Sequence, residues 1–289
     1  MIFVEFYLFL SFLKTIVSLN QLAFSGGGSF GAVEIGILKR INKIEKKKYD
    51  IYTGISAGGL NAGFLSYYND LSIGIKNAEF LYSSMKNRMV YEIYPHNELA
   101  LLNTEPLFNT LTKIIDKMGK EPVINTYIGA TNLYTGRLDI FNFNDNNDID
   151  KVLLLMSTSA IPVVFPPITY NNYMYADGGT LSNELLDIIH DGSYLNITYI
   201  TTSEGITEIF EPITTLQDMI IRITQIVVGN YNDPITKINQ NCKNPYGEVN
   251  MFYVDNSYLE DYNMLNFDNG KELIDIGYNY METKKYMLC

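Results

Sequence analysis

Near the start of this chain, an apolar strand pattern runs directly into a glycine-rich turn and then into a helical pattern. Residues 20–25 (NQLAFS) are typical of a short strand, and GGGSFG follows at 26–31. From Phe30 to about Lys47 the apolar residues recur at helical spacing and form one stripe, made of Val33, Ile37, Ile41 and Ile44. A strand joined to a helix in this way is typical of α/β proteins, whose strands are largely parallel.

The same alternation continues along the chain, so we predict an α/β fold with a mainly parallel sheet. Further strands are expected at 50–56, 121–133, 136–143, 173–179, 194–202 and 250–255. Further helices are expected at 57–68, 150–160, 181–192, 214–228 and 271–286. Because no repeat and no Pro/Gly/Ser-rich linker divides the chain, we expect one compact domain with C-terminal elements added to it.

Composition narrows the classes of partner. Of the 289 residues, 47% are hydrophobic and 18% are charged, which fits a globular chain with a sizeable core. The net charge of -11 argues against nucleic acid as a main partner, because phosphates repel an acidic surface. It also argues against broad docking on an anionic membrane, although a local basic patch could still act.

Metal and cofactor sites are not expected. Two cysteines, Cys242 and Cys289, and two histidines, His96 and His190, have no metal-ligand spacing and form no disulfide framework. The run at 142–151 lacks the glycine and the final glutamate of a calcium loop, so we interpret it as a solvated loop.

The first 19 residues are strongly apolar but carry Glu5 and Lys14. An acidic start and a late basic residue reverse the charge order of a signal peptide, and the segment is too interrupted for a confident membrane-spanning helix. A signal sequence, a peripheral membrane anchor and a helix packed on the domain remain open. We favour the last two, in an intracellular protein.

A serine in GISAGG lies between an expected strand and an expected helix. Gly54, Ser56 and Gly58 form G-x-S-x-G, and this context is the one that a nucleophile elbow needs. The sharp turn exposes the hydroxyl group, and the flanking glycines avoid a clash across the turn. The helix that follows directs its positive end at the site.

The serine needs a base, and Asp177 in ADGG is the strongest candidate. It ends an expected strand and precedes Gly178 and Gly179, which suits an exposed, tightly turned carboxylate; a helix cap is the alternative. The order Ser56, Asp177, His190 is also that of α/β-hydrolase triads. Because His190 falls at the end of a helical pattern, where histidine more often stabilises the helix, we favour a Ser–Asp dyad.

Backbone amides of the glycine turn can complete such a site. The turn SGGGSFG at 25–31 would supply an oxyanion hole, with the amides of Gly27, Gly28 and Ser29 as candidate donors. The same glycines fit G-x-G-x-x-G of a dinucleotide site, which needs an acidic residue at the end of the second strand. Asp50 precedes that strand, so a nucleotide-binding oxidoreductase is the weaker hypothesis.

Three motifs in this order resemble the patatin-like phospholipase family: GGGSFG at 26–31, GISAGG at 54–59 and DGG at 177–179. The segment STSAIPVVFPPI at 157–168 and the helix expected at 271–280 are also similar to parts of that family. The resemblance covers about residues 20–205. It implies a three-layer α/β/α sandwich, lipid acyl hydrolysis without a cofactor, and a dyad without histidine, in which Ser56 is the nucleophile and Asp177 the general base. By the same resemblance the oxyanion hole is framed by Gly26, Gly27, Gly28, Ser29 and Gly31.

Phe30 departs from the family pattern, which has Arg or Lys at this place in the first motif. The backbone amides remain, so we expect catalytic competence with an uncertain substrate preference. The expected organisation is an apolar extension over 1–19, a patatin-like domain over 20–205 and C-terminal elements over 206–289. The expected partners are a phospholipid or another acyl lipid and, transiently, a membrane surface. An inactive lipid-binding protein on the same fold is the alternative.

Overall fold

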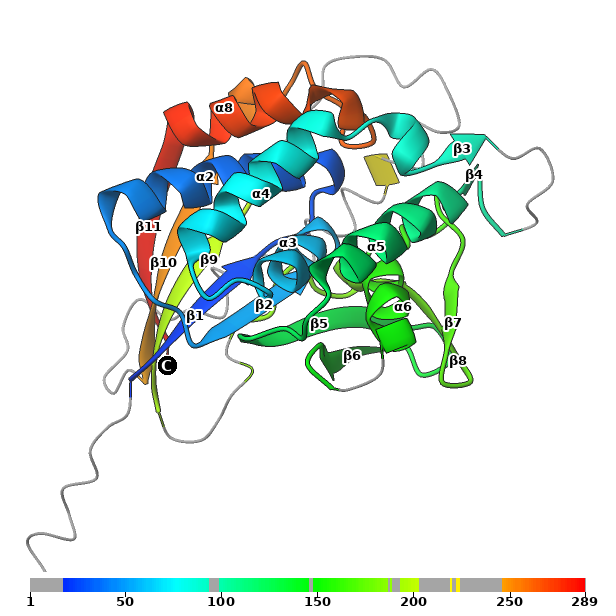
Figure 1. Cartoon of the computed structure of the whole chain (residues 1–289), viewed down its shortest axis with the longest axis horizontal. Coiled ribbons are helices and arrows are strands. Elements are labelled where there is room, and N and C mark those ends of the chain that lie inside the picture. Colours follow the sequence, from blue (N-terminus) through cyan, green and yellow to red (C-terminus); the bar gives the residue numbers. More distant parts are fainter. Residues whose placement is uncertain are drawn as a thin grey trace, which may run out of the picture.

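The protein is described by a computed structural model over residues 18–93, 99–145, 148–186, 188, 193–202, 219, 222–223 and 246–288. In this part of the chain a nine-stranded sheet has the order β11-β10-β9-β1-β2-β5-β8-β7, and β6 pairs with β5 (Figure 1). The strands are β1 (Ser18–Phe24), β2 (Ile51–Ile55), β5 (Asn125–Asn132), β6 (Arg137–Asn142), β7 (Ile168–Tyr170), β8 (Tyr173–Asp177), β9 (Tyr194–Ile200), β10 (Gly247–Val254) and β11 (Met281–Leu288). A separate pair is made by β3 (Glu92–Ile93) and β4 (Leu102–Asn103).

The middle of the sheet is parallel and its margins are antiparallel. Strands β10, β9, β1, β2 and β5 run parallel, whereas β11, β6, β8 and β7 pair antiparallel with their neighbours. Strand β1 pairs with β2 so that Phe24 lies opposite Gly54. The turns after these two strands therefore meet at one edge of the sheet, as expected for neighbouring parallel strands.

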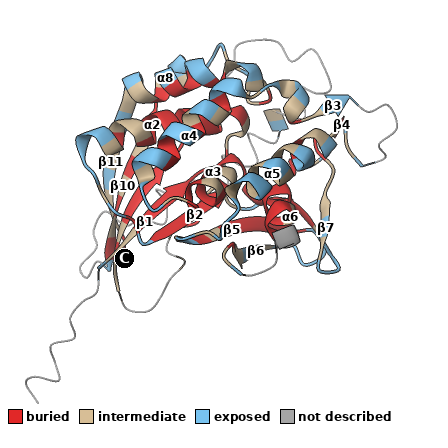
Figure 2. Ribbon diagram, in the orientation of Figure 1, coloured by how far each residue is buried: buried red, intermediate tan, exposed pale blue. Residues whose placement is uncertain are grey.

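Helices flank this sheet, so the predicted α/β/α class with a mainly parallel sheet is confirmed. They are α2 (Gly31–Ile44), α3 (Ala57–Leu65), α4 (Leu71–Ser84), α5 (Glu105–Met118), α6 (Asp148–Thr158) and α8 (Gly270–Tyr280). Figure 1 shows α2, α4 and α8 side by side, with α3 and α5 next to them over β2 and β5. In Figure 2 the buried surfaces of α2 and α3 face the strands and the exposed surface of α4 faces outward.

The core lies between this helical layer and the sheet. One cluster joins β1 to α2, α4 and α8 through Phe24, Ile37 and Leu273, among others. A second cluster joins α5 and α6 to β5 through Leu111, Leu155 and Ile128. Burial of apolar surface of this kind is the main force holding the helices on the sheet.

Several sequence expectations are corrected by the structure. Ile44 is 72% exposed, so it does not belong to the buried stripe of α2. Residues 281–286, expected to continue a helix, instead form β11 paired with β10. Helices α4 and α5 were not expected at all. Strand β1 begins at Ser18, so the last two residues of the expected N-terminal extension belong to the sheet.

The helix expected over 181–192 does not form in residues 181–186 and 188; the other residues of this range lie outside the described part. Side-chain bonds compete with a helix here, because Ser182 Oγ donates to the Glu184 carbonyl and Asn183 reaches back to Gly26. Of the helix expected at 214–228, only residues 219, 222 and 223 are described, and they are helical. Within the described ranges, no helix is both long and apolar enough to cross a membrane.

Candidate active site

Ser56 occupies the sharp turn between β2 and α3. It is the N-cap of α3 and has φ 53° and ψ -126°, a backbone conformation that a non-glycine residue adopts only under strain. The turn is held from outside: the Ser56 amide donates to Thr158 Oγ1 at 2.9 Å, and Thr158 Oγ1 donates to the Gly129 carbonyl at 2.6 Å. The last residue of α6 thereby fixes the elbow to β5.

Ser56 and Asp177 are in direct contact. Ser56 Oγ donates to Asp177 Oδ2 at 2.7 Å, and each residue is only 5% exposed. Asp177 comes from β8, which pairs antiparallel with β5 so that Asp177 lies opposite Ala130. Strand β5 in turn lies beside β2, and this arrangement brings the ends of β2 and β8 together.

Asp177 is held by a backbone amide of the turn that follows it and by a side chain of β5. Its Oδ1 accepts the Gly179 amide at 2.7 Å, and its own carbonyl accepts Thr131 Oγ1 at 2.9 Å. Burial raises the pKa of Asp177 from 3.8 to about 7, against the opposing effect of the bonds from Ser56 and Gly179. A carboxyl group with this pKa can both take up and release a proton near neutral pH.

The glycine turn lies against the elbow. A Cβ on Gly26 would come within 3.1 Å of Ser56 Cβ, which shows how closely the two turns approach. The Gly26 amide is engaged, because it donates to Asn183 Oδ1 at 2.9 Å. The Ser29 amide donates to the Met264 carbonyl at 2.7 Å, so the expectation that it points at the oxyanion is not met. The Gly31 amide is used within the short 3-10 turn that precedes α2.

Two amides of the turn remain available. Among the described residues, the amides of Gly27 and Gly28 donate to no acceptor. Gly28 has φ +59° and lines the same cavity as Ser56. These two successive N–H groups are therefore the ones that can receive an anion beside Ser56.

Close packing explains why glycines surround both functional side chains. A Cβ on Gly54 would overlap the Gly58 carbonyl, and one on Gly58 would overlap the Ser25 carbonyl. A Cβ on Gly178 would lie 2.5 Å from the Gly129 carbonyl. Each of these sites needs a residue without a side chain, because the obstacle is backbone that cannot move aside.

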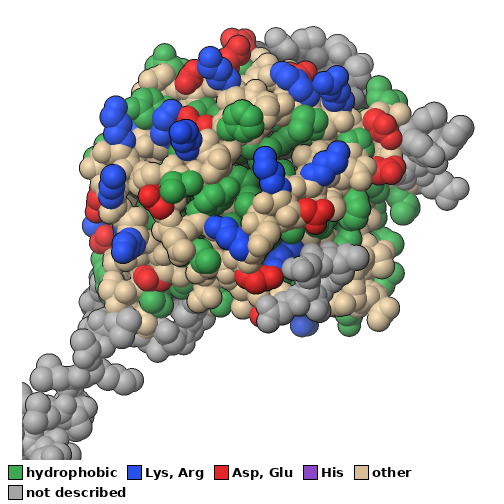
Figure 3. Space-filling model, viewed as in Figure 1, with side chains coloured by type: hydrophobic (Ala, Val, Ile, Leu, Met, Phe, Trp, Pro, Cys, Tyr) green, Lys and Arg blue, Asp and Glu red, His purple; other side chains and the backbone are tan. Residues whose placement is uncertain are grey.

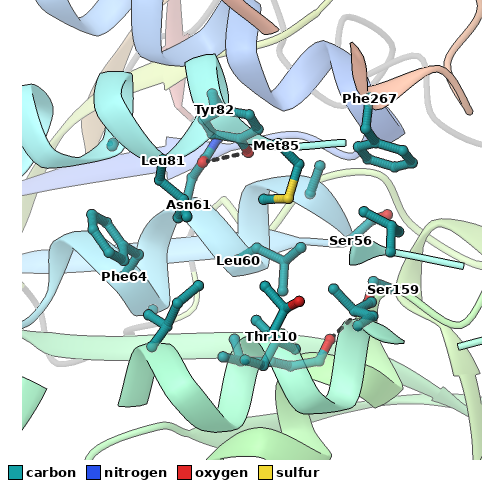
Figure 4. A pocket seen from close by; sticks show the side chains of 18 of the residues that line it. Ser56, Leu60, Asn61, Phe64, Leu81, Tyr82, Met85, Thr110, Ser159 and Phe267 are labelled. Atoms are coloured by element: carbon teal, nitrogen blue, oxygen red, sulfur yellow. Dashed lines mark hydrogen bonds between the residues drawn. The ribbon is translucent and has the colours of Figure 1, made fainter. Parts of the chain in front are cut away.

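Ser56 opens onto an apolar cavity that runs along α3 between α4 and α5 (Figure 4). In Figure 4, Leu60 and Phe64 extend from Ser56 along one side, with Leu81, Tyr82 and Met85 above. Helix α5 contributes another part of the lining, through Leu107, Leu111, Ile114, Ile115 and Met118. By the rise of an α-helix, the cavity extends about 12 Å from Ser56 to Phe64.

The polar side chains in the cavity wall already have partners. Thr110 Oγ1 donates to the Met89 carbonyl, Ser159 Oγ to the Leu155 carbonyl, and Tyr82 OH to Asn61 Oδ1, each at 2.8 Å. The wall therefore offers an entering molecule mainly apolar contact. A hydrocarbon chain fits this lining, whereas a charged group would lose its hydration without replacement.

Sequence reasoning missed the residues that hold the site together. Thr158 lies inside the segment at 157–168 that resembles the family, but nothing in that pattern assigns it to the elbow. Asn183 and Glu34 act through contacts between distant segments, which no local pattern reveals. Phe30, the departure from the family pattern, packs partly buried against the apolar core cluster of α2.

The other candidate residues of the sequence are His96, His190 and Asp50. His96 and His190 lie outside the described residues. Asp50 Oδ2 accepts the Asn20 amide at 2.9 Å near the start of β1 and β2, at the opposite edge of the sheet from the glycine turn. In the described part of the chain, no group of His, Cys, Asp and Glu side chains could hold a metal ion.

One family model matches more than half of the chain. Residues 22–189 match the family described as patatin-like phospholipase. The chain is 27% identical over 189 residues to "Probable lipid hydrolase 463L" of Invertebrate iridescent virus 6, a match covering 58% of this chain and 62% of that protein. It is 22% identical over 272 residues to "Uncharacterized protein R571" of Acanthamoeba polyphaga mimivirus, covering 86% of each.

The match spans 62% of the first viral relative, which is less than two thirds of its length. Among solved structures, VipD from Legionella pneumophila aligns with a TM-score of 0.42 and 12% identity, over 92% of this chain and 68% of that chain.

Proposed function

Because the chain belongs to the patatin-like phospholipase family, we propose that it is a phospholipase A-like lipid acyl hydrolase with Ser56 as nucleophile and Asp177 as general base. The observation that carries this proposal is the 2.7 Å bond between Ser56 Oγ and Asp177 Oδ2 at the end of an apolar cavity. It supports cleavage of a fatty-acyl ester whose carbonyl lies at Ser56.

The proposed reaction follows from this geometry. Asp177 accepts the hydroxyl proton while Ser56 Oγ attacks the ester carbonyl, and the amides of Gly27 and Gly28 stabilise the resulting oxyanion. Asp177 then returns the proton to the leaving alcohol, which leaves an acyl group on Ser56. Water, deprotonated by Asp177, attacks the acyl-enzyme, and collapse of this second intermediate releases the fatty acid and returns the proton to Ser56.

The cavity supports an acyl chain as the group held during the reaction. More than half of its lining residues belong to α3, α4 and α5, and more than half are Leu, Ile, Phe or Met. Burying a methylene group in such a lining contributes about 0.8 kcal/mol. No metal or cofactor enters the proposed reaction.

A transient contact with a membrane surface is part of the same proposal. On α4, Ile73 and Phe80 are 53% and 75% exposed, with exposed Lys76 between them on the same helical face. Across the cavity, α5 exposes Phe108 and Lys113. Figure 3 shows hydrophobic side chains gathered over the middle of this face, with Lys and Arg side chains around them. Such a face suits contact with a lipid surface that carries negative charge.

The test is a Ser56→Ala substitution in the purified full chain. We expect it to abolish fatty-acid release from phospholipid and labelling by a fluorophosphonate, because both reactions need the hydroxyl group. Ser66→Ala is the matched control: Ser66 is buried at the other end of α3 and its hydroxyl group donates to the Gly63 carbonyl, so the variant should retain both activities.

Unchanged ester hydrolysis in Ser56→Ala would contradict the proposal. The alternative, an inactive lipid-binding protein on the same fold, predicts that the unaltered chain binds phospholipid vesicles but is not labelled at Ser56.

A further inference from the structure

Glu34 is a buried carboxyl group that the proposed reaction does not use. It lies in the first turn of α2, directly after the glycine turn, and is fully buried. Among the described residues no lysine or arginine pairs with it; all of its bonds are to hydrogen-bond donors. Such a group is costly to keep in a core without a role, because burial penalises its charge.

Its three donors come from two different parts of the site. Glu34 Oε1 accepts the Ser25 amide at 2.9 Å and Ser25 Oγ at 3.0 Å, and Ser25 is the residue before the glycine turn. Glu34 Oε2 accepts Asn61 Nδ2 at 2.9 Å, and Asn61 belongs to α3, the helix that Ser56 begins. One carboxyl group thus joins the turn to the helix of the nucleophile.

Asn61 closes the connection at the other end of the turn. Its Nδ2 also donates to the Gly31 carbonyl at 3.0 Å, and Gly31 is the last residue of the turn. Its Oδ1 accepts Tyr82 OH at 2.8 Å, which fixes the orientation of the amide (Figure 4). Both ends of the glycine turn, Ser25 and Gly31, are therefore tied to the same Glu34–Asn61 pair.

We infer that Glu34 is a positioning residue: with Asn61 it holds both ends of the glycine turn against α3. The amides of Gly27 and Gly28 thereby stay directed at the place beside Ser56 that the carbonyl oxygen of the substrate would occupy. This inference rests on the proposed function for its kinetic consequence. Other bonds also hold the turn, since Asn183 and Thr202 bond Gly26 and Ser29 Oγ donates to the Asn263 carbonyl at 3.1 Å, but none of these partners belongs to α3.

The bonding works in either protonation state of Glu34. Burial raises the pKa of Glu34 well above its usual range, against the opposing effect of the bonds from Asn61 and Ser25. A neutral Glu34 can donate to Ser25 Oγ, which can then donate its own hydrogen to the Gly26 carbonyl at 3.1 Å. Tyr82 and Tyr199 are the titratable groups that interact with Glu34, and burial raises the pKa of each. The pH dependence of the reaction should therefore come from Asp177 alone.

Glu34→Gln is the most informative substitution, because glutamine keeps the shape of the side chain and has one hydrogen-bond acceptor fewer. In either orientation, the glutamine NH2 group faces a donor: Ser25 N in one and Asn61 Nδ2 in the other. We expect kcat to fall about 100-fold, as for a small misplacement of catalytic groups, with KM and the apparent pKa of the rate profile unchanged. Fluorophosphonate titration counts the active sites, so that kcat refers to folded enzyme.

Gln21→Met is the matched control for the loss of buried hydrogen bonds; Gln21 lies on β1, the strand that leads into Ser25. Gln21 Nε2 donates to Thr53 Oγ1 and to the Leu185 carbonyl, away from the glycine turn. This variant should lose stability but keep kcat per active site. In a double-mutant cycle, Asn61→Ala and Glu34→Gln should be non-additive, since they break one unit. Asn61→Ala alone also serves if Glu34→Gln does not fold.

A second measurement does not depend on activity. Hydrogen exchange at the bonded amides of Ser29 and Phe30 should be several-fold faster in Glu34→Gln and unchanged in Gln21→Met. Unchanged exchange at these amides, or an unchanged kcat per active site, overturns the inference. If the unaltered protein neither hydrolyses esters nor reacts with the fluorophosphonate, the proposed function fails, and the exchange result still decides the role of Glu34.

Discussion

The carboxyl group of Asp177 lies where its proton is held more tightly than usual, yet a general base has to be ionised. Burial raises its pKa to about 7, so at neutral pH both forms are well populated. The hydroxyl group of Ser56 and the amide of Gly179 stabilise the ionised form, which keeps the pKa from rising further. Two predictions at the residue scale follow from this balance.

The first concerns rate against pH. In the proposed reaction ionised Asp177 accepts the Ser56 proton, so kcat/KM should rise through an apparent pKa of about 7 and reach a plateau above it. The measurement is kcat/KM for ester hydrolysis from acid to mildly alkaline pH, because this ratio reports ionisation in the free enzyme. A rate that is flat down to pH values near the ordinary pKa of aspartate would contradict Asp177 as the base.

The second concerns stability against pH. The folded protein binds the Asp177 proton more tightly than the unfolded chain, so this group favours folding at low pH and loses that contribution as pH rises from about 4 to about 7. Asp177→Asn removes the effect, because an amide bonds Ser56 and Gly179 without a charge.

The variant should therefore be inactive but more stable above pH 7, by at most about 4 kcal/mol, with the difference shrinking toward pH 4. Thermal unfolding of both proteins at several pH values measures it; an equal or lower stability of the variant at pH 8 would be the contrary result.

At the scale of elements, the sequence predicted the segments whose own residues determine their structure. Strands β1, β2, β5, β6, β8, β9 and β10 and helices α2, α3 and α6 all fall within the expected ranges or shifted by a few residues. Their patterns are strong because each is either a buried apolar run or an apolar stripe beside a glycine turn. The motif order also predicted which turns would meet, since β1 and β2 are parallel neighbours.

The remaining elements depend on contacts that sequence alone does not show. Residues 281–288 contain good helix formers, but pairing along the whole of β10 makes them a strand. The sequence does contain local start and stop signals for α4 and α5. Asp70 is the N-cap of α4 and accepts the Ser72 amide, and Gly119 ends α5 in the left-handed conformation. The links from Thr158 and Asn183 to the site join residues about 100 or more positions apart.

The contact between α3 and β1 gives a prediction at this scale. A Cβ on Gly58 would overlap the Ser25 carbonyl, so Gly58→Ala should push α3 from β1 and cost about 1–3 kcal/mol of stability, together with most of the activity. Gly74→Ala is the control within α4, where the nearest atoms are side-chain carbons of Leu65 and Tyr68 at 3.1 Å or more. It should be close to neutral, since alanine favours a helix. Denaturant unfolding compares the two, and equal stability losses would refute the contact as the cause.

At the scale of the whole molecule, the acidic net charge of -11 contrasts with the face around the cavity, where exposed Lys76 and Lys113 lie among exposed apolar side chains. We predict that Phe80→Ser and Lys76→Glu each weaken sedimentation with vesicles that contain phosphatidylglycerol, and that added salt weakens binding of the unaltered chain.

Ile140→Ser, on β6, is the control because Ile140 is similarly exposed, at 48%, on a strand away from α4 (Figure 1). Equal loss of vesicle binding in all three variants would remove α4 as the contact surface.

The elements that hold the proposed catalytic groups are not all the same as those that line the cavity, and this affects which substitutions the protein can accept. The groups that perform the proposed chemistry are held by β1, β2, α3 and β8, whereas part of the cavity lining comes from α5, which donates no bond to Ser56 or Asp177. Substitutions on α5 can therefore alter which acyl chains are accepted while the reaction itself stays intact. In this architecture selectivity and reactivity are separately adjustable, so a library confined to Leu107, Leu111, Ile114 and Met118 is the natural starting point for redirecting the protein to shorter or longer lipids.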